Sequence, residues 1–250
     1  MSDGPELIRP DLGVPRLRIV STTRTGGVST GARASFNLAM HVGDDPAAVA
    51  ENRRRLQGGA GLPDEPLWLE QVHGTQVVVH DGPDLPAPRA DAVVAFEPGR
   101  VCVVMTADCL PVVLADRDGT RVGVAHAGWR GLSAGVIEAT VAALGVPGRG
   151  LLAWLGPAIG PDAFEVGTEV RDAFLATDRR AAACFVPNAR GRLQADLHGL
   201  ARLVLGRLNV EVAGASPDCT HTDAERYFSH RRDPGSGRQA TLAWLEPAAC

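Results

Sequence analysis

The chain has 250 residues, of which 45% are hydrophobic, and a formal net charge of −4. This length and apolar content suffice for one large or two small globular domains with a buried core. A slightly negative chain argues against a nucleic-acid partner and favours a small-molecule substrate. All 25 basic residues are arginines, and an arginine keeps its proton in proteins, so a catalytic lysine base, a Schiff-base lysine and a P-loop lysine are excluded.

The five cysteines lack C-x-x-C spacing, and their odd number argues against a disulfide framework. We therefore expect a reducing, cytoplasmic location. The N-terminus has no basic segment followed by an apolar one, and no apolar run approaches the roughly 18 residues of a membrane-spanning helix. We expect neither an export signal nor a membrane contact, and a monomer or a weak oligomer.

The N-terminal half alternates apolar runs with glycine-rich loops. Residues 1–15 contain three prolines and little periodicity, which predicts a flexible lead-in before a single domain at 16–250. Asp45 and Pro46 are typical of a helix start, and Gly58-Gly59 is expected to end that helix. His73-Gly74 is expected to form a bend between two short strands. The strands expected in this half lie at 16–22, 68–72, 75–80, 91–96 and 101–106.

The stretch 105–130 predicts a β-hairpin. Two apolar runs flank Asp118-Gly119, and an Asp-Gly pair between apolar runs is a strong hairpin signal. Cys109 stands at the entry of the first strand and His126 at the exit of the second. Because antiparallel strands bring their outer ends together, the thiol and the imidazole are expected to face each other.

The remaining elements indicate an α/β fold. Helical spacing predicts helices at 132–144, 169–176 and 197–208, and apolar runs predict strands at 151–155 and 241–245. The runs at 91–96 and 101–106 are expected to join the hairpin in a central sheet that is too apolar to have one wet face. Without a repeat or a linker, the sequence favours one α/β domain.

His73, Cys109 and His126 form the strongest candidate site. Each is expected at a strand end beside a loop, and catalytic zinc sites combine three ligands of this kind with an open position. The same residues also allow a cysteine nucleophile activated by His126. A third interpretation is structural, since a cysteine in an apolar strand is commonly a small buried hydrophobe. Asp91 and Asp108 are candidates for orienting ligands or for acid catalysis.

Several segments of the sequence resemble motifs of a known family. The segments T-A-D-C-L-P-V (106–112) and H-A-G-W-R-G (126–131) are similar to hallmark motifs of the family labelled multicopper polyphenol oxidoreductase or laccase. That family includes the bacterial peptidoglycan editing factor and a mammalian purine nucleoside enzyme of macrophages. Further similar segments are T-R-T-G-G-V-S (23–29), F-N-L (36–38), H-V-G-D-D-P (41–46), E-N-R-R-R-L (51–56), Q-V-H-G (71–74), A-D-A (90–92), L-G-P-A-I-G-P (155–161), F-E-V-G (164–167) and S-H-R-R-D (229–233).

The resemblance implies a fold, a metal and an activity. The implied fold is an α/β/β/α sandwich of mixed sheets, similar to cysteine-hydrolase-like toxins. The implied metal is a zinc ion, sometimes reported as copper, held by His73, Cys109 and His126. The implied activity is phosphorolysis of adenosine, inosine and methylthioadenosine to the base and a sugar 1-phosphate, together with adenosine deamination. The alternative implied by the family is a peptidoglycan-editing hydrolase acting on precursors that contain L-serine.

Laccase activity is not expected from this chain. A multicopper oxidase needs about ten histidine ligands, many in H-x-H pairs, whereas the chain has seven histidines and no such pair. It also departs from the family where members often carry a cysteine after I-G-P, because Asp162 and Ala163 follow Pro161 here. His230 stands where a tyrosine is common, and no role is assigned to it.

A purine nucleoside and phosphate are therefore the expected substrates, and the site residues divide into two groups. We expect Cys109, His126 and Asp108 to take part in catalysis. The residues expected to bind the substrates are Arg24, Asn37, Gln71 and Arg130. The arginines would contact phosphate, because a guanidinium binds oxyanions through paired hydrogen bonds, and the amides would contact the purine or the ribose.

Overall fold

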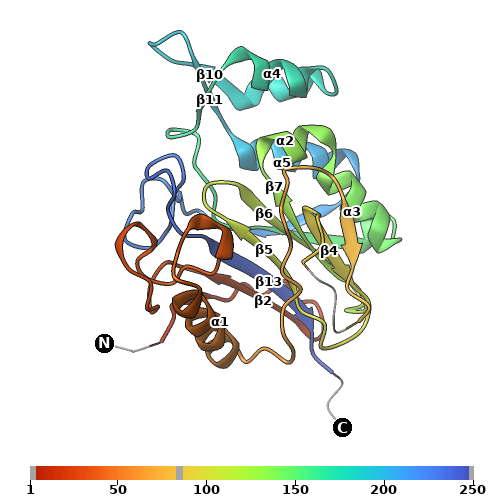
Figure 1. Cartoon of the computed structure of the whole chain (residues 1–250). Helices are drawn as coiled ribbons and strands as arrows, with labels where there is room; N and C mark the ends of the chain where they lie inside the picture. The colour runs from red at the N-terminus through yellow and green to blue at the C-terminus, as the bar shows by residue number, and fades with distance from the viewer. Residues whose placement is uncertain (1–3, 83–86, 248–250) are drawn as a thin grey trace.

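Strands and helices follow one another along the chain and form a mixed α/β fold with several sheets (Figure 1). The computed structural model describes residues 4–82 and 87–247. Residues 1–3 of the expected lead-in, and Cys250 at the other end, lie outside these ranges. The four cysteines of the described ranges are free: Cys102, Cys109, Cys184 and Cys219.

The largest sheet has six strands and contains the predicted hairpin. Its strands, in spatial order, are β12 (Glu211–Ala215), β8 (Leu151–Leu155), β6 (Leu110–Asp116), β7 (Val122–Ala127), β4 (Ala92–Ala95) and β3 (Val77–Val79). The pairs β12–β8 and β3–β4 are parallel and the others are antiparallel, so the sheet is mixed. The turn between β6 and β7 is longer than Asp118-Gly119 alone, and Gly119 supplies a left-handed residue there with φ of 65°.

The second sheet has four antiparallel strands. Their spatial order is β1 (Leu7–Ile8), β2 (Leu17–Thr22), β13 (Gln239–Leu245) and β5 (Cys102–Thr106). The prediction that residues 101–106 join the hairpin in one sheet is therefore wrong, because β5 pairs with β13 instead. A continuous apolar run indicates that both faces of a strand are buried, but it does not indicate which sheet the strand joins. The short strand β1 lies within the expected lead-in and pairs with β2.

A small third sheet, five α-helices and four short 3-10 helices complete the described fold. The small sheet has the order β10 (Phe185–Pro187), β11 (Leu193–Ala195) and β9 (Glu165–Val166). The helices are α1 (Pro46–Ala60), α2 (Trp129–Ala134), α3 (Val136–Leu144), α4 (Thr168–Leu175) and α5 (Leu197–Arg207). None of the helices in the described ranges is both long and apolar enough to cross a membrane.

Two helices differ from the prediction by more than one residue, and glycine conformation explains where the first is interrupted and where the second ends. The helix expected at 132–144 starts at Trp129 and is interrupted at Gly135, where φ is 103°. The first helix begins as expected with Asp45, whose side chain accepts a hydrogen bond from the backbone of Ala47. It continues through Gly58-Gly59 and ends at Gly61, because Gly61 adopts the left-handed conformation that closes a helix.

Strand β6 shows how the two large sheets and the helices are layered. Val112 and Leu114 pack in the core shared with α3 and α5, whereas Val113 and Ala115 pack against the four-stranded sheet. Successive side chains of a strand point to opposite faces, so both faces of β6 are buried and its sequence is continuously apolar. Helix α1 covers the far face of the four-stranded sheet, where Leu56 is part of a third core (Figure 1).

Candidate metal centre and active site

The hairpin and a preceding bend bring three metal-ligand side chains together. Cys109 immediately precedes β6, and His126 lies in β7 opposite Pro111. His73 lies at the bend before β3, and its ring centroid is 4.8 Å from that of His126. The ligand atoms of the three residues all lie within 4.8 Å of one another. The structure thus groups the three residues that the sequence predicted as ligands, in an arrangement that could hold a metal ion.

Asp91, at the start of β4, orients both histidines. Its Oδ1 accepts hydrogen bonds from His126 Nδ1 at 2.8 Å and from the backbone N–H of His73 at 2.9 Å. Its Oδ2 accepts from the backbone N–H of Gly74 at 2.6 Å and of Val72 at 3.2 Å. His73 has a φ of 60°, an uncommon conformation for a residue with a side chain. The carboxylate therefore stabilises the bend and leaves Nε2 of His126 available to a ligand.

The electrostatics of the group favour a thiolate. Burial alone would raise the pKa of the Cys109 thiol, but the His126 and His73 rings lower that pKa to about 6. Burial acts to lower the pKa of His126, whereas Cys109 and Asp91 raise it to about 9. Burial also opposes the charge of Asp91, yet hydrogen bonds from His126 and Gly74 hold its pKa below the usual range. A thiolate is the form of cysteine that binds metals and attacks electrophiles.

Gly128 allows the backbone to pass close to the group. A Cβ at this position would lie 2.7 Å from Cys109 Sγ and 3.3 Å from Cδ2 of His73. Real Cβ atoms essentially never approach a heavy atom as closely as 2.7 Å. The absence of a side chain at Gly128 is therefore a condition for the observed position of the sulfur.

The donor set fits a zinc ion. One thiolate and two imidazoles, with cavities beside them, match the three-ligand pattern of catalytic zinc sites, and copper accepts the same donors. Within residues 4–82 and 87–247, the His, Cys, Asp and Glu side chains form one group of this kind. Such a group holds a single ion, whereas a multicopper cluster needs several.

Two cavities adjoin the candidate metal group. The larger has a volume of about 340 Å³ and is bordered by His41, Arg130, His230 and Arg238. No carboxylate lies among the described residues of its wall. The second has a volume of about 210 Å³ and is bordered by the apolar side chains of Trp129, Ile159 and Phe164, together with Asp108 and Arg231. His73, Cys109, Arg130 and His230 line both cavities.

Two of the predicted substrate residues lie in the cavity walls. Arg130 lines both cavities, and its guanidinium carbon is 4.5 Å from the centre of the Trp129 ring. Gln71 lines the larger cavity, but its amide is already bonded to Met105. The side-chain nitrogen donates to the Met105 carbonyl at 2.8 Å, and the side-chain oxygen accepts from the Met105 N–H at 2.7 Å. Gln71 thereby fixes the wall to the end of β5.

The structure does not bring the other two predicted substrate residues to either cavity wall. The guanidinium of Arg24 donates to the carbonyls of Ala34 and Ala224 and lies over the ring of Phe228. Asn37 is fully buried, and its Oδ1 accepts from the backbone N–H of Arg238 at 2.9 Å. Both side chains bond to loop backbone, in part to residues far away in the sequence such as Ala224 and Arg238, which the residue type alone cannot reveal.

Asp108 lies beside the group but does not bond to its histidines. Its Oδ1 accepts from the Thr220 hydroxyl at 2.8 Å, and its Oδ2 accepts from the backbone N–H of Arg231 at 2.7 Å. The residue adopts a φ of 90° at the bend between β5 and β6. Asp108 thus fastens the C-terminal segment, which carries His230, Arg231 and Arg238, to the residue that precedes Cys109.

Sequence reasoning missed part of the cavity wall. His41, Arg231 and Arg238 were given no role, although His41 and Arg231 stand in segments that resemble the family. Arg238 lies in none of those segments, but it follows a glycine-rich stretch and immediately precedes the last strand. Burial lowers the pKa of Arg238, an effect that Cys109 and Asp108 oppose. The structure alone shows that this arginine is near the thiol.

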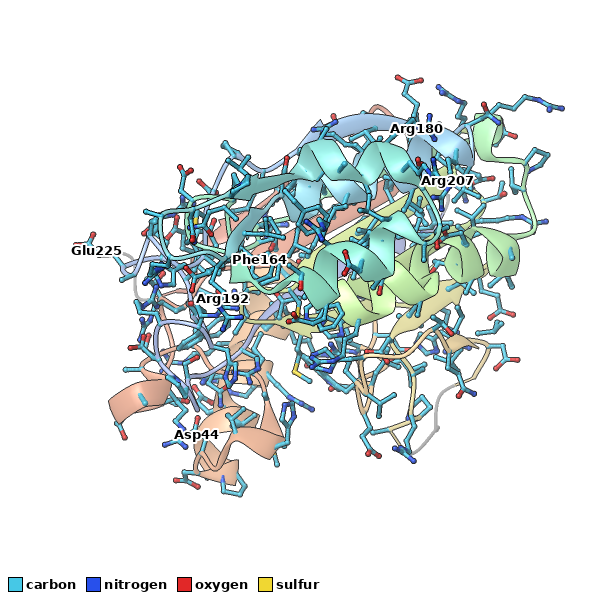
Figure 2. The ribbon with its side chains drawn as sticks, turned by 90° about the horizontal axis from the view of Figure 1, so that it is seen from above. Asp44, Phe164, Arg180, Arg192, Arg207 and Glu225 are labelled. Carbon is cyan, nitrogen blue, oxygen red and sulfur yellow. The ribbon has the colours of Figure 1, made fainter. Side chains whose placement is uncertain are left out.

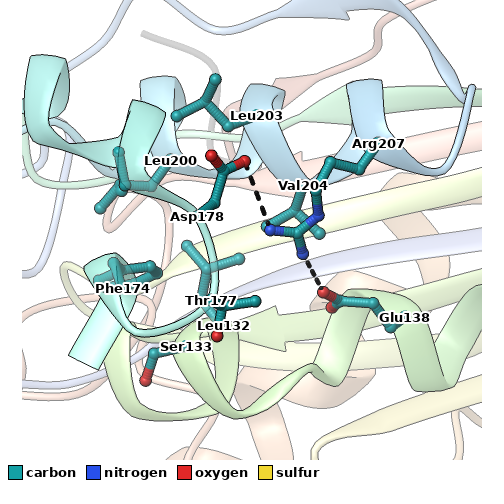
Figure 3. A pocket seen from close by; sticks show the side chains of 11 residues that line it. Leu132, Ser133, Glu138, Phe174, Thr177, Asp178, Leu200, Leu203, Val204 and Arg207 are labelled. Atoms are coloured by element: carbon teal, nitrogen blue, oxygen red, sulfur yellow. Dashed lines mark hydrogen bonds and ion pairs between the residues drawn. The ribbon is translucent and has the colours of Figure 1, made fainter.

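Two other hollows lie at different distances from this site: one, lined by Phe164 and Arg192, borders the smaller cavity, and the other surrounds Arg207. Figure 2 shows Phe164 and Arg192 close together, far from Arg180 and Arg207. Figure 3 shows the small pocket around Arg207, where Arg207 donates to Glu138 at 2.7 Å and lies 3.6 Å from an oxygen of Asp178. That pocket has a volume of about 20 Å³, which is room for about one water molecule.

The fold and the site agree with the family that the sequence resembles. A family model described as multi-copper polyphenol oxidoreductase laccase matches residues 18–246, and the chain belongs to this family. Its members that are similar to this chain include a purine nucleoside phosphorylase of Pseudomonas aeruginosa, 54% identical over 241 residues, which cover 96% of this chain and 98% of that protein. The purine nucleoside phosphorylase YfiH of Escherichia coli is 49% identical over 241 residues, with 96% and 99% covered.

Solved structures show the same fold. A Neisseria meningitidis protein superposes with a TM-score of 0.92 at 46% identity, over 96% of this chain and 99% of that one. The protein YlmD of Geobacillus stearothermophilus superposes with a TM-score of 0.83 at 29% identity, over 93% of each chain. The agreement confirms the family assignment made from the motifs.

Proposed function

We propose that this chain is a metal-dependent purine nucleoside phosphorylase acting on adenosine and inosine. In this proposal His73, Cys109 and His126 hold one Zn²⁺, and Cu²⁺ would fit the same ligands. The observation that carries the proposal is a thiolate and two imidazoles beside a cavity whose described wall is rich in arginine and histidine and free of carboxylates. The similarity to proteins named purine nucleoside phosphorylase supports it.

The roles of the protein groups follow from their positions. A zinc ion held by His73, Cys109 and His126 would supply a positive charge able to polarise a substrate oxygen. Asp91 holds the His126 ring in one orientation, and Arg130 offers a guanidinium to whichever anion occupies the cavities. We assign Asp108 a positioning role, because both its oxygens are engaged by Thr220 and Arg231. Asn37 acts in the same way on the backbone of Arg238.

The proposal is tested by metal analysis and a product assay on the same preparation. We expect about one zinc per chain, because the described residues contain one group of three candidate ligands. Incubation with inosine should release hypoxanthine and ribose 1-phosphate only when phosphate is present. Release of hypoxanthine and free ribose without phosphate would show a hydrolase instead. A zinc-loaded protein that leaves inosine unchanged with phosphate present would refute the proposal.

Two finer activities belong to the same proposal. We propose that methylthioadenosine is also cleaved by phosphate and that adenosine is deaminated, with water supplying the oxygen that replaces the amino group. Deamination is detected as ammonia and inosine formed from adenosine without phosphate. If adenosine yields only adenine, and only with phosphate, the deaminase part is wrong.

A cysteine hydrolase is the second candidate, and one observation favours it. Cys109, His126 and Asp91 form a chain of thiol, imidazole and carboxylate, the arrangement by which a general base activates a nucleophile. Its substrates would include peptidoglycan precursors that contain L-serine. The two candidates respond differently to a chelator, because a cysteine hydrolase keeps its activity when zinc is removed and loses it on alkylation of Cys109. Loss of phosphorolysis on zinc removal and its return on adding zinc would favour the first candidate.

The family resemblance also motivates proposals on the fold and assembly. We propose that residues 16–250 form one catalytic domain of the α/β/β/α sandwich type seen in cysteine-hydrolase-like toxins. The three packed cores support this assignment, since they involve helices on both outer faces of the two large sheets. We propose a monomer or weak oligomer, which size-exclusion chromatography with light scattering would test at several protein concentrations.

A further inference from the structure

Two cavities of different chemistry meet at the candidate metal group, and the difference assigns them to different parts of the reaction. The inference rests on the proposed phosphorolysis, which brings together an anion and an aromatic base. A phosphate needs donors without competing carboxylates, whereas a purine needs apolar and planar surfaces. The chemistry of each wall can therefore be matched to one part of the substrates.

The larger cavity has the properties of an anion site. Arg238 uses Nη1 to donate to the carbonyls of Ser236 and Gly237. Its Nε and Nη2 have no hydrogen-bond partner in the described part of the chain, and it forms no ion pair with a carboxylate there. The bonds to the two carbonyls fix the guanidinium, and Asn37 fixes the backbone below it. A half-buried arginine that is fixed but not neutralised is suited to bind an oxyanion.

A second arginine and a histidine face the same cavity. Arg130 lines it from the start of α2 and, like Arg238, pairs with no carboxylate among the described residues. His41 lines it from the loop before α1, and its pKa is lowered by burial and by Arg238 and Arg53. Two guanidinium groups and an imidazole that can donate a hydrogen bond thus approach this cavity from three separate parts of the chain. The volume of about 340 Å³ also leaves room for a ribose beside a phosphate.

The smaller cavity has the properties of a base site. Trp129, Ile159 and Phe164 give one part of its wall a large apolar and aromatic surface, which the larger cavity lacks. Its carboxylate, Asp108, already accepts two hydrogen bonds. The guanidinium of Arg231 donates to the Glu165 carbonyl and lies 5.4 Å from the centre of the Phe164 ring. Aromatic rings and guanidinium planes are the surfaces on which bases stack.

A third cavity nearby is less suited to phosphate. It has a volume of about 250 Å³ and is lined by Arg130, Arg192 and Arg231, but Glu165 and Glu169 line it as well. Carboxylates repel an anion and compete for the guanidinium groups. Arg192 therefore serves as a matched control for Arg238.

We propose that phosphate and the ribose bind in the larger cavity against Arg238 and His41, and that the purine binds in the smaller cavity against Trp129 and Phe164. The reacting carbon of the ribose then lies between the two cavities, beside His73 and Cys109. A phosphate oxygen forms a new bond to this carbon while the bond between the carbon and the purine nitrogen breaks. The electron pair of the broken bond stays on the purine. The proton of HPO₄²⁻ ends on the purine, so hydrogen phosphate and nucleoside become ribose 1-phosphate and the free base.

The test separates binding of phosphate from binding of nucleoside. The zinc-loaded wild-type protein is titrated with inorganic phosphate alone by calorimetry, and KM is measured for each substrate. Arg238→Gln should weaken phosphate binding and raise KM for phosphate by about tenfold to a hundredfold, the loss of a charge-assisted hydrogen bond, with KM for inosine changed less than about threefold. Trp129→Leu should raise KM for inosine by about tenfold, since a stacked base contributes roughly 1–3 kcal/mol, and leave phosphate binding unchanged. Arg192→Gln should change neither.

Two further variants keep the test decisive. If Arg238→Gln does not fold, His41→Asn should raise KM for phosphate selectively, and Arg238→Lys should bind phosphate better than Arg238→Gln because it keeps the charge. Equal phosphate affinity of wild type and Arg238→Gln, or a rise in the inosine KM alone, would overturn the assignment. A wild-type protein that forms no ribose 1-phosphate would refute the proposed function, and the calorimetric comparison of Arg238→Gln with Arg192→Gln would still decide on the phosphate site.

Discussion

Two buried carboxylates lie close to the candidate metal group and have different bonding partners. Asp91 bonds to the His126 ring and to three backbone N–H groups at the bend of residues 72–74. Asp108 bonds to Thr220 and to the backbone of Arg231. The Asp91 region therefore sets the geometry of the candidate ligands, whereas the Asp108 region attaches the C-terminal wall of the cavities.

The difference arises from what each backbone presents to its carboxylate. At the 72–74 bend, consecutive N–H groups converge on one point, and Asp91 fills that point with four hydrogen bonds in total. Asp108 sits at a bend of its own and points toward a segment that is distant in sequence. Two residues of one type next to one site can thus act on different parts of it, and substitutions can separate the two actions.

The largest effect is expected from Cys109→Ser, which removes the thiolate from the group. Loss of a metal ligand should lower zinc affinity by more than the roughly hundredfold that loss of an outer hydrogen-bond partner can cause. Zinc per chain after dialysis measures the effect. Cys184→Ser, at a free cysteine elsewhere in the described chain, is the control and should keep its zinc. Equal zinc content in the two variants would exclude Cys109 as a ligand.

A smaller but clear effect is expected from Asp91→Asn. An asparagine side chain has the same size, but only its oxygen accepts hydrogen bonds, whereas both oxygens of Asp91 accept them. Some donors of the bend or of His126 therefore lose their acceptor, and zinc affinity should fall by about tenfold to a hundredfold. The free energy of unfolding should fall by about 1–3 kcal/mol, because buried donors lose their acceptor. Competition with a zinc-binding dye and denaturant unfolding measure the two quantities. Unchanged zinc affinity would contradict the role given to Asp91.

Gly128→Ala tests the close approach at the sulfur. The new Cβ would lie 2.7 Å from Cys109 Sγ, so the thiol must shift. We expect zinc affinity to fall by about tenfold, the smaller of the losses typical when a partner of a metal ligand is changed. Gly58→Ala is the matched control, because its Cβ would meet nothing within 4 Å. In a helix that change should stabilise the protein by about 0.5–1 kcal/mol. Zinc affinity that is the same in both variants would rule out the proposed steric requirement.

The smallest effect on the metal is expected from Asp108→Asn. The change leaves Asp91 and the three candidate ligands in place, so zinc affinity should change by less than about threefold. This change is well below the loss of affinity expected when a residue that bonds directly to a metal ligand is replaced. Weaker bonds to Thr220 and Arg231 should lower the free energy of unfolding by about 1–2 kcal/mol. The same dye competition and unfolding measurements apply. A loss of zinc affinity equal to that of Asp91→Asn would remove the distinction between the two regions.

Local patterns predicted most of the elements and failed where partners are distant in sequence. The hairpin, the α1 N-terminus and the bend at His73 depend on neighbouring residues, and the structure has all three. The strand expected at 68–72 is absent, and only isolated bridges at Leu67 and Glu70 are found there. Whether a short apolar run pairs along its length depends on an adjacent strand, which no local pattern contains.

By itself, the sequence determined the candidate metal ligands. Cys109 and His126 are brought together by a hairpin whose turn signal is local, and His73 lies at a bend marked by the following glycine. Only the tertiary structure decided which polar residues face the cavities. Pairing of β13 with β2 and β5 brings Arg238 next to the thiol, while loop packing buries Asn37 and engages Arg24 elsewhere. Residue type indicates what a side chain can bind, but long-range strand pairing decides what it meets.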